Sequence, residues 1–322
     1  MAGAADALAS KGRAVEEWVD LHFFRPVGVR LARALVPTPV TPDHVTVGCL
    51  ALGLAAGWCF VPASPAVNAL GFALFIASDL LDSADGQLAR LRGTSTRFGR
   101  ILDGVSDNTR FTNLYLSVLA RLTLTDGRAF WPAFLLALAA GVSHSYQSAA
   151  VDAVRNAYLE VAEGGRGEFE LPEDTPAPSG AVPTEHLFLR LAQGGYAAYV
   201  RRQASLLPAT VRLVRRLRLF GDVPAAGVAR AEYAAREAPV VRQCAWLGQN
   251  IRFPLVALPC VLGHPSVFLW LTLVPLNLVL AAVLVAHEGR AARVAAALDR
   301  PAPAAASGPA ASDPAAGAYA RG

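Results

Sequence analysis

The sequence predicts an all-α integral membrane protein with six transmembrane helices and an N-terminal amphipathic helix in the membrane interface. Of its 322 residues, 54% are hydrophobic and 17% are charged, whereas soluble domains carry about 25% charged residues. Apolar stretches of roughly 20 residues recur, which is the length that crosses a hydrocarbon core. Lys11 is the only lysine, and the arginines cluster in a few connections. This composition excludes a soluble enzyme, a disordered protein and a collagen-like fibre, and the arginine clusters indicate membrane orientation with no nucleic-acid partner.

The first 40 residues are predicted to form the interfacial helix. Trp18, Leu21, Phe24 and Val27 fall near one helical face and charged residues fall on the others, the pattern of a helix that lies along a membrane surface. Charged residues interrupt this segment, so no cleavable signal peptide is expected and the first membrane helix directs insertion.

The six apolar spans follow a clear helix start. Thr41 is suited to the N-cap and Pro42 to the first helical position. The predicted spans are 45–62, 66–83, 101–122, 129–151, 240–262 and 266–286.

The distribution of arginine predicts the orientation of the spans. The connections 62–66 and 262–266 contain no lysine or arginine, whereas 84–100 holds four arginines and 152–242 is richer still. Because positive loops stay on the cytoplasmic side, both termini and the 84–100 connection are predicted to be cytoplasmic. The use of arginine in place of lysine suggests a GC-rich bacterial genome, and therefore a multi-pass protein of the cell inner membrane.

The membrane domain is expected over 41–290, with a 152–240 insertion between the fourth and fifth spans. The first part of the insertion has the glycine, proline and acidic content of a loop. The second part, 186–220, alternates apolar residues with arginine, which fits either a helix on the anionic inner leaflet or a solvated linker helix. The tail, 291–322, is rich in proline, alanine and glycine and is expected to be disordered.

Five aspartates lie at the end of the second span and the start of the third: Asp79, Asp82, Asp85, Asp103 and Asp107. Ionisable residues inside apolar spans are functional candidates, because their burial in a membrane is costly. Asp82 and Asp85 are three residues apart and Asp103 and Asp107 four, so each pair shares a helical face. If the two helices are neighbours, four carboxylates converge. All-oxygen ligands select a hard ion such as Mg²⁺ or Mn²⁺, and four carboxylates suffice for two ions.

The residues between the aspartates fit a site for a phosphorylated nucleotide. Gly86 and Gly99 leave room for close approach to the backbone, Ala89 keeps the same region small, and Arg90 offers a cation for a diphosphate. The alternative is a solvated helix end with capping aspartates. One pair of aspartates fits that alternative, whereas eight residue types in this order do not.

These residues resemble the signature of the CDP-alcohol phosphotransferase family: D-x-x-D-G-x-x-A-R, eight residues, then G-x-x-x-D-x-x-x-D. The resemblance covers about residues 40–290, although the 152–240 insertion is longer than typical members carry. Every fixed position is matched, by Asp82, Asp85, Gly86, Ala89, Arg90, Gly99, Asp103 and Asp107.

The resemblance implies transfer of a substituted phosphoryl group from a CDP-alcohol to an acceptor hydroxyl, with release of CMP. It makes Asp82, Asp85 and Asp103 metal ligands, and makes Asp107 both ligand and general base. It also places one further set of residues around the cytidine and its phosphates: Gly86, Ala89, Arg90 and Gly99, with Thr94 and Thr96 as weaker candidates for the base. Asp79 lies outside the signature and is expected to bond a neighbouring helix. A homodimer is expected as in many relatives.

Other polar residues in the spans are candidates for the acceptor pocket: Arg110, His144, Gln147, Arg155 and Arg252. His144 is either a second base or a packed, hydrogen-bonded core residue. Arg252 needs an anion or carboxylate if it is buried.

Two substrate pairings remain open. Either CDP-diacylglycerol reacts with a polar alcohol, or a soluble CDP-aminoalcohol reacts with a lipid such as diacylglycerol or ceramide, so at least one substrate is a lipid. Two other classes of function are weaker alternatives. A divalent-cation transporter predicts carboxylates in the membrane on both sides of the bilayer, whereas the clustered aspartates all lie on the predicted cytoplasmic side. An inactive scaffold predicts a lost aspartate, whereas all four signature aspartates are present.

Overall fold

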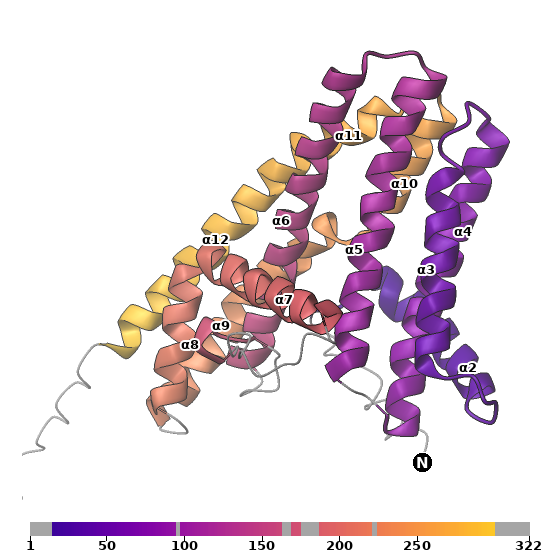
Figure 1. Cartoon of the computed structure of the whole chain (residues 1–322). Coiled ribbons are helices and arrows are strands. Elements are labelled where there is room, and N and C mark those ends of the chain that lie inside the picture. Colours follow the sequence, from indigo (N-terminus) through magenta and orange to yellow (C-terminus); the bar gives the residue numbers. More distant parts are fainter. Residues whose placement is uncertain (1–14, 95–96, 163–168, 175–186, 221–223, 300–322) are drawn as a thin grey trace, which may run out of the picture.

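The computed structural model describes residues 15–94, 97–162, 169–174, 187–220 and 224–299. All regular elements in these ranges are helices, so the prediction of an all-α protein is confirmed for this part of the chain. A helix lies at each of the six predicted spans (Figure 1). These helices are α3 (Pro42–Trp58), α4 (Pro65–Arg92), α5 (Arg97–Ala120), α6 (Phe130–Ala162), α10 (Gln249–Val261), and the broken pair α11 (Ser266–Leu273) and α12 (Pro275–Leu298).

The bundle helices run up and down between two ends. The connections from α3 to α4, from α5 to α6 and from α10 to α11 lie together at the upper end in Figure 1, and α2 (Arg25–Leu35) lies at the lower end. An aromatic core holds the bundle together: the ring of Phe75 stacks on Phe60 at 6.0 Å and on Phe253 at 5.2 Å between centroids. The arrangement agrees with the predicted hairpin order of the spans.

Two helical segments of the described chain are long and apolar enough to cross a membrane, namely Pro65–Arg92 and Ser266–Leu298, which contains α11 and α12. The helices α3 and α10 have 17 and 13 residues, fewer than the roughly 20 that span a bilayer core. Six crossings therefore stay a prediction. Large apolar side chains are nevertheless exposed on the bundle, among them Trp58, Leu70, Leu116, Leu135, Leu258, Trp270 and Leu278.

Local sequence signals fix where α3 and α4 begin and end. The Thr41 hydroxyl accepts from the His44 amide, and the His44 ring accepts from the Thr41 amide, so the predicted N-cap is confirmed. Helix α4 begins after Ser64 and stops at Gly93, whose φ of 66° favours glycine. Arg92, the last residue of α4, ties this helix to the chain that leads into α3. Its guanidinium donates to the carbonyls of Leu35, Val36, Thr38 and Val40.

The N-terminal segment is helical and packs along α4. A π-helical turn, η1 (Asp20–Phe24), continues into α2 (Arg25–Leu35). Gly28 faces Ser83 so closely that a Cβ would lie 2.5 Å from the Ser83 hydroxyl. Phe24 is buried whereas Trp18 is 71% exposed. The location of this helix at a membrane interface stays a prediction.

The insertion forms a packed helical unit at the lower end of the bundle, which we call the insertion unit: α7 (Leu187–Leu206), α8 (Pro208–Phe220) and α9 (Pro224–Gln243). Helix α8 buries Leu213, Val214 and Leu217, in a core shared with α6, α9 and α12. Its basic residues Arg215 and Arg218 pair with acidic side chains. The apolar face of α8 is thus buried inside the protein. Whether its basic residues lie at the inner leaflet or in solvent stays a prediction.

The insertion unit also corrects the boundary of the tail. Residues 291–298 were expected to be disordered but belong to α12, because Ala291 and Val294 are buried in the core of the unit. Residues 300–322 lie outside the described residues.

A buried polar cluster joins the insertion unit to α12. His287 lies between Glu237 of α9 and Thr210 of α8: its Nδ1 is 2.7 Å from Glu237 Oε1 and its Nε2 is 2.9 Å from Thr210 Oγ1. The neighbouring Glu288 carboxylate accepts from the amides of Ala209 and Thr210 and so caps the start of α8. These bonds fix α8 and α9 against α12.

Candidate metal and nucleotide site

Three of the signature aspartates converge where α4 meets α5. One carboxylate oxygen each from Asp82, Asp85 and Asp103 lies within 4.8 Å of the others. Asp82 and Asp85 come from the last turns of α4, and Asp103 comes from the first turns of α5. Three carboxylates at this separation fit a hard divalent ion such as Mg²⁺.

The local structure explains this convergence. The left-handed Gly93 ends α4, so that the chain reverses and α5 begins at Arg97. Helix α3 packs against both α4 and α5. Its Gly53 allows close approach, because a Cβ there would lie 2.5 Å from the Cδ atom of Arg110. Bulk at this point in α3 would push α5 away from the aspartates of α4.

Asp85 is held by a residue that the sequence analysis treated only as part of a helix start. The Thr46 hydroxyl of α3 donates to Asp85 Oδ2 at 2.6 Å, and both side chains are buried. Thr46 is not a signature residue, but its hydrogen bond orients the Asp85 carboxylate. Residues that hydrogen-bond to metal ligands commonly orient them in this way. The sequence signal that could have indicated this role was the position of Thr46, a polar residue about one turn into the helix that Thr41 caps.

Asp107, the fourth signature aspartate, has a different partner. The Arg110 guanidinium donates through Nη2 to Asp107 Oδ1 and to Asp82 Oδ1, the latter at 3.2 Å. Its Nη1 donates to Asp79 Oδ1 at 3.3 Å and to Ser78 Oγ at 2.9 Å. Asp79 thus bonds a neighbouring helix, as expected. Arg110, predicted as an acceptor-pocket candidate, lies among the carboxylates instead.

The predicted nucleotide-binding residues lie beside the carboxylates. Gly86 and Arg90 are one turn apart on α4, and a Cβ at Gly86 would lie 3.5 Å from Arg90 Nη1. The Arg90 side chain and Thr94 are exposed, and Ala89 is half-buried. Gly99 falls within α5, and Thr96 lies outside the described residues. Their roles stay predictions.

The remaining acceptor-pocket candidates fall in two places. In the bundle interior, the Arg252 guanidinium donates to Gln147 Oε1 at 2.8 Å and to the Leu247 carbonyl at 3.1 Å. His144, on the same helix as Gln147, is buried against the Phe111 ring and lies 3.2 Å from the Tyr115 hydroxyl. Of the two alternatives for His144, a second base or a packed, hydrogen-bonded core residue, these contacts agree with the second.

Arg155 lies apart from this group, because it binds the N-terminal segment. Its Nη2 atom is 2.9 Å from Glu17 Oε1, and Asn250 donates to the other oxygen of Glu17 at 2.8 Å. Burial raises the pKa of the Glu17 carboxyl above its ordinary value, and the Arg155 guanidinium opposes that shift. Glu17 therefore ties the N-terminal segment to α6 through Arg155 and to α10 through Asn250.

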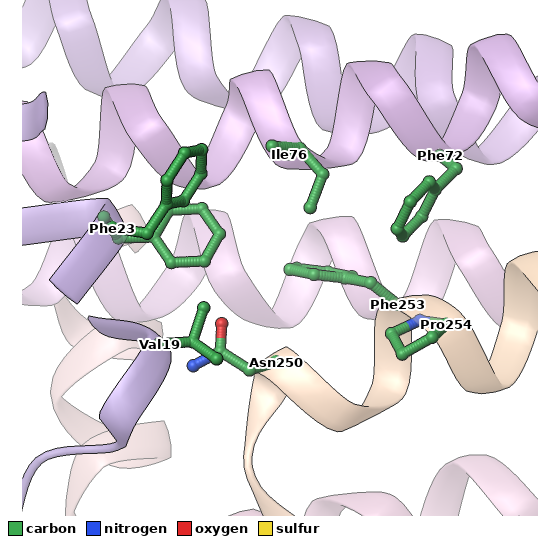
Figure 2. A pocket seen from close by; sticks show the side chains of 8 residues that line it. Val19, Phe23, Phe72, Ile76, Asn250, Phe253 and Pro254 are labelled. Carbon is green, nitrogen blue, oxygen red and sulfur yellow. The ribbon is translucent and has the colours of Figure 1, made fainter. Parts of the chain in front are cut away.

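An apolar hollow of about 370 Å³ lies between the N-terminal turn, α4 and α10 (Figure 2). Phe72 and Ile76 contribute from α4, on the helical stripe that continues to Asp79 one turn later. Asn250 is the polar residue at its edge. The sequence analysis missed this hollow, because its walls come from segments far apart in the chain: Val19, Phe23, Phe24, Phe72, Ile76, Asn250, Phe253 and Pro254.

Comparison with known proteins finds a match for the part of the chain that carries the aspartates. A family model described as CDP-alcohol phosphatidyltransferase matches residues 39–167. All eight signature positions lie inside this match. This segment belongs to the CDP-alcohol phosphatidyltransferase family. The chain is also 31% identical, over 147 residues, to a protein of Thermococcus kodakarensis named "Bifunctional IPC transferase and DIPP synthase"; the alignment covers 45% of this chain and 32% of the relative. The chain thus matches about a third of the length of that relative.

The CDP-alcohol phosphatidyltransferase segment corresponds to helices α3 to α6. It contains the converging carboxylates, Thr46 and Arg110. The insertion unit, α10 and Arg252 lie beyond the match. The match therefore contains the carboxylate site and also the acceptor-pocket candidates Arg110, His144, Gln147 and Arg155.

Proposed function

We propose that the protein is a membrane phosphotransferase that moves a substituted phosphoryl group from a CDP-alcohol to an acceptor hydroxyl, releasing CMP, in phospholipid or sphingolipid headgroup synthesis. The observation that carries this proposal is the convergence of Asp82, Asp85 and Asp103 at signature positions of a CDP-alcohol phosphatidyltransferase segment. The name of the Thermococcus relative, a transferase and synthase, supports the same class of reaction.

In this proposal Asp82, Asp85 and Asp103 hold Mg²⁺ or Mn²⁺. The bound ion supplies positive charge that stabilises the diphosphate as the phosphoryl group is transferred. The sequence predicts two ions, with Asp107 as a further ligand. Arg90, exposed one turn from Gly86, supplies a protein cation for the same diphosphate.

Asp107 is the general base. Its side chain is 31% exposed, so an acceptor hydroxyl has access to it. The carboxylate takes the hydroxyl proton while the acceptor oxygen bonds to phosphorus and the bond from phosphorus to the CMP oxygen breaks. The products are the phosphodiester and CMP.

The apolar hollow supports a lipid substrate. Its walls are almost wholly apolar (Figure 2). Its α4 wall, with Phe72 and Ile76, continues along the same helical stripe to Asp79, to which Arg110 donates. A lipid chain buried there would leave the headgroup near the carboxylates. Both pairings remain open: CDP-diacylglycerol with a polar alcohol, or a CDP-aminoalcohol with a lipid acceptor.

We place the protein in the cell inner membrane with six spans and with both termini and the active site cytoplasmic. The exposed apolar side chains around the bundle support contact with lipid. The lower end of the bundle in Figure 1 holds the end of α4, the start of α5 and the insertion unit. These helix ends carry the aspartates, and the insertion unit is rich in arginine, and this distribution of charge supports a cytoplasmic location for that end.

The proposed activity is tested by CMP release from protein purified in detergent with Mg²⁺. CDP-diacylglycerol and CDP-ethanolamine are offered separately, each with glycerol phosphate, inositol phosphate, serine, diacylglycerol and ceramide. We expect CMP release with one of the two donors, and loss of that release in Asp107→Asn, whose side chain has the same shape but cannot act as the base. Folded protein that releases no CMP with any pair and binds no CDP would instead support a transporter or a scaffold.

We also propose that two copies of the chain pair through the outer face of α5. This face carries Asn108, Thr109 and Thr112 beside a groove of about 440 Å³ shared with α3. Polar side chains facing lipid are unfavourable, and small residues let helices approach closely. Gly104 on the same face has no atom within 4 Å of a Cβ position, so it leaves space for a partner helix.

The pairing predicts the effect of bulk at Gly104. In Gly104→Leu the added side chain fits the single chain but meets a second copy, so the detergent-corrected mass from light scattering is expected to fall from two chains to one. Gly289→Leu is the matched control, because Gly289 on α12 is equally open and lies outside the proposed face. An unchanged mass in Gly104→Leu would rule out this interface.

A further inference from the structure

Arg110 occupies a place that the signature alone assigns to metal. The side chain is 3% exposed and is bonded to three carboxylates, those of Asp79, Asp82 and Asp107. A single nitrogen, Nη2, bridges Asp82 Oδ1 and Asp107 Oδ1. Asp82 on α4 and Asp107 on α5 are two of the four carboxylates that the signature assigns to metal. A guanidinium stays protonated in proteins, so this bridge is a permanent positive charge.

The packing around Arg110 leaves its stem little freedom. Helix α3 passes over it at Gly53, where a Cβ would lie 2.5 Å from Arg110 Cδ and 2.8 Å from Cγ. Ser78 accepts a hydrogen bond from Nη1 on the α4 side. The guanidinium is therefore directed toward the carboxylates by its covalent stem as well as by charge.

The four signature aspartates fall into two groups, three that lie close together and one that is bonded to Arg110. Asp82, Asp85 and Asp103 bring their oxygens within 4.8 Å of one another, and Asp107 does not belong to that group. Asp107 faces Arg110 instead. Three aspartates thus fit one ion, and the fourth is bonded to the guanidinium.

We propose that Arg110 is the second cation of the site, so that the chain binds one divalent ion on Asp82, Asp85 and Asp103 where the signature alone predicts two. This inference rests on the proposed function and deepens it. Arg110 is then a positioning residue: its guanidinium neutralises the Asp82 and Asp107 pair and holds Asp107 in place as the base.

The test is the number of Mn²⁺ ions bound per folded chain, counted by electron paramagnetic resonance of free Mn²⁺ during a titration of the detergent-purified protein. We expect one ion for the wild type. In Arg110→Met the cation is lost while the stem is kept, so Asp82 and Asp107 become available and the count is expected to rise to two. In Arg110→Lys a positive charge remains, and the count is expected to stay at one.

The matched control is Arg121→Met. Arg121 follows α5 directly at its opposite end, is equally buried and pairs with Asp126, so its loss removes a buried arginine without touching the carboxylate site. Its count is expected to stay at one. Two ions on the wild type would overturn the proposal, and so would a count of one or none on folded Arg110→Met. If Arg110→Met does not fold, the proposal is judged on the other two counts: one ion on both the wild type and Arg110→Lys supports it, and two ions on either overturns it.

The ion count is separate from the proposed activity. One ion on the wild type without CMP release from any substrate pair would leave the metal assignment intact and reject the transferase. CMP release from a chain that binds two ions would keep the transferase and reject the role of Arg110. Absence of Mn²⁺ binding to the folded wild type would reject both.

Discussion

We expect Asp85→Asn to lower the rate of CMP release by about a thousandfold and to abolish Mn²⁺ binding at concentrations that saturate the wild type. Asp85 is buried, and its carboxylate faces Asp82 and Asp103 while Thr46 donates to its other side. Asparagine keeps the size of the side chain and the bond from Thr46 but removes the charge. Losing several kcal/mol of charge stabilisation in the transition state corresponds to about a thousandfold in rate.

The control for this prediction is Asp126→Asn. Asp126 also pairs with a buried arginine, Arg121, but lies at the opposite end of the bundle. Its replacement is expected to leave both Mn²⁺ binding and CMP release of the folded protein within about twofold of wild type, because the Arg121–Asp126 pair does not touch the carboxylate site. If Asp85→Asn kept its Mn²⁺ and its rate, the three-aspartate site would not be the metal site.

We expect His287→Leu to lower the thermal midpoint of the detergent-purified protein by about 10 °C. His287 and Glu237 are both fully buried and 2.7 Å apart, and the other ring nitrogen of His287 is bonded to Thr210. Removing the ring leaves the Glu237 carboxylate buried with Arg290 at 3.5 Å. Breaking such a pair on one side costs about 3–5 kcal/mol, and each kcal/mol shifts the midpoint of a protein of this size by about 2–4 °C.

A double variant separates this explanation from a simple packing defect. When Glu237→Leu is added to His287→Leu, no buried carboxylate remains, so about half of the lost stability is expected to return. Arg293→Ala on the exposed side of the same helix is expected to move the midpoint by about 1 °C or less. A double variant that melts below the single variant would show that the pair contributes packing alone.

The carboxylate site was predictable because its residues are close in sequence. Asp82 and Asp85 share one helix, Asp103 and Asp107 share the next, and the connection between them is short. Helical periodicity then places each pair on one face, and the short reversal returns the chain so that the end of α4 and the start of α5 bring their aspartates close together. The cap at Thr41 was predictable for the same reason, since its bonds reach only three residues along the chain.

The residues that form hydrogen bonds to the aspartates could not be predicted from local spacing. Thr46 bonds Asp85 across 39 positions, and Arg110 bonds Asp79 across 31. The apolar pattern of α8 was compatible with a membrane surface, a solvent-exposed helix or a protein core. Only the structure shows that this face includes Leu213, which is buried in a core shared with α12, far away in sequence.

The sequence by itself determined the helical class, the approximate positions of the helices and the pairs of aspartates that share a helical face, because these depend on composition and on spacing within one helix. The tertiary structure decided which carboxylates lie together, that Arg110 bridges Asp82 and Asp107, and that the insertion forms a packed unit. Burial and hydrogen bonding between distant segments are set by how helices pack, and local periodicity carries no information about the neighbour that a helical face meets.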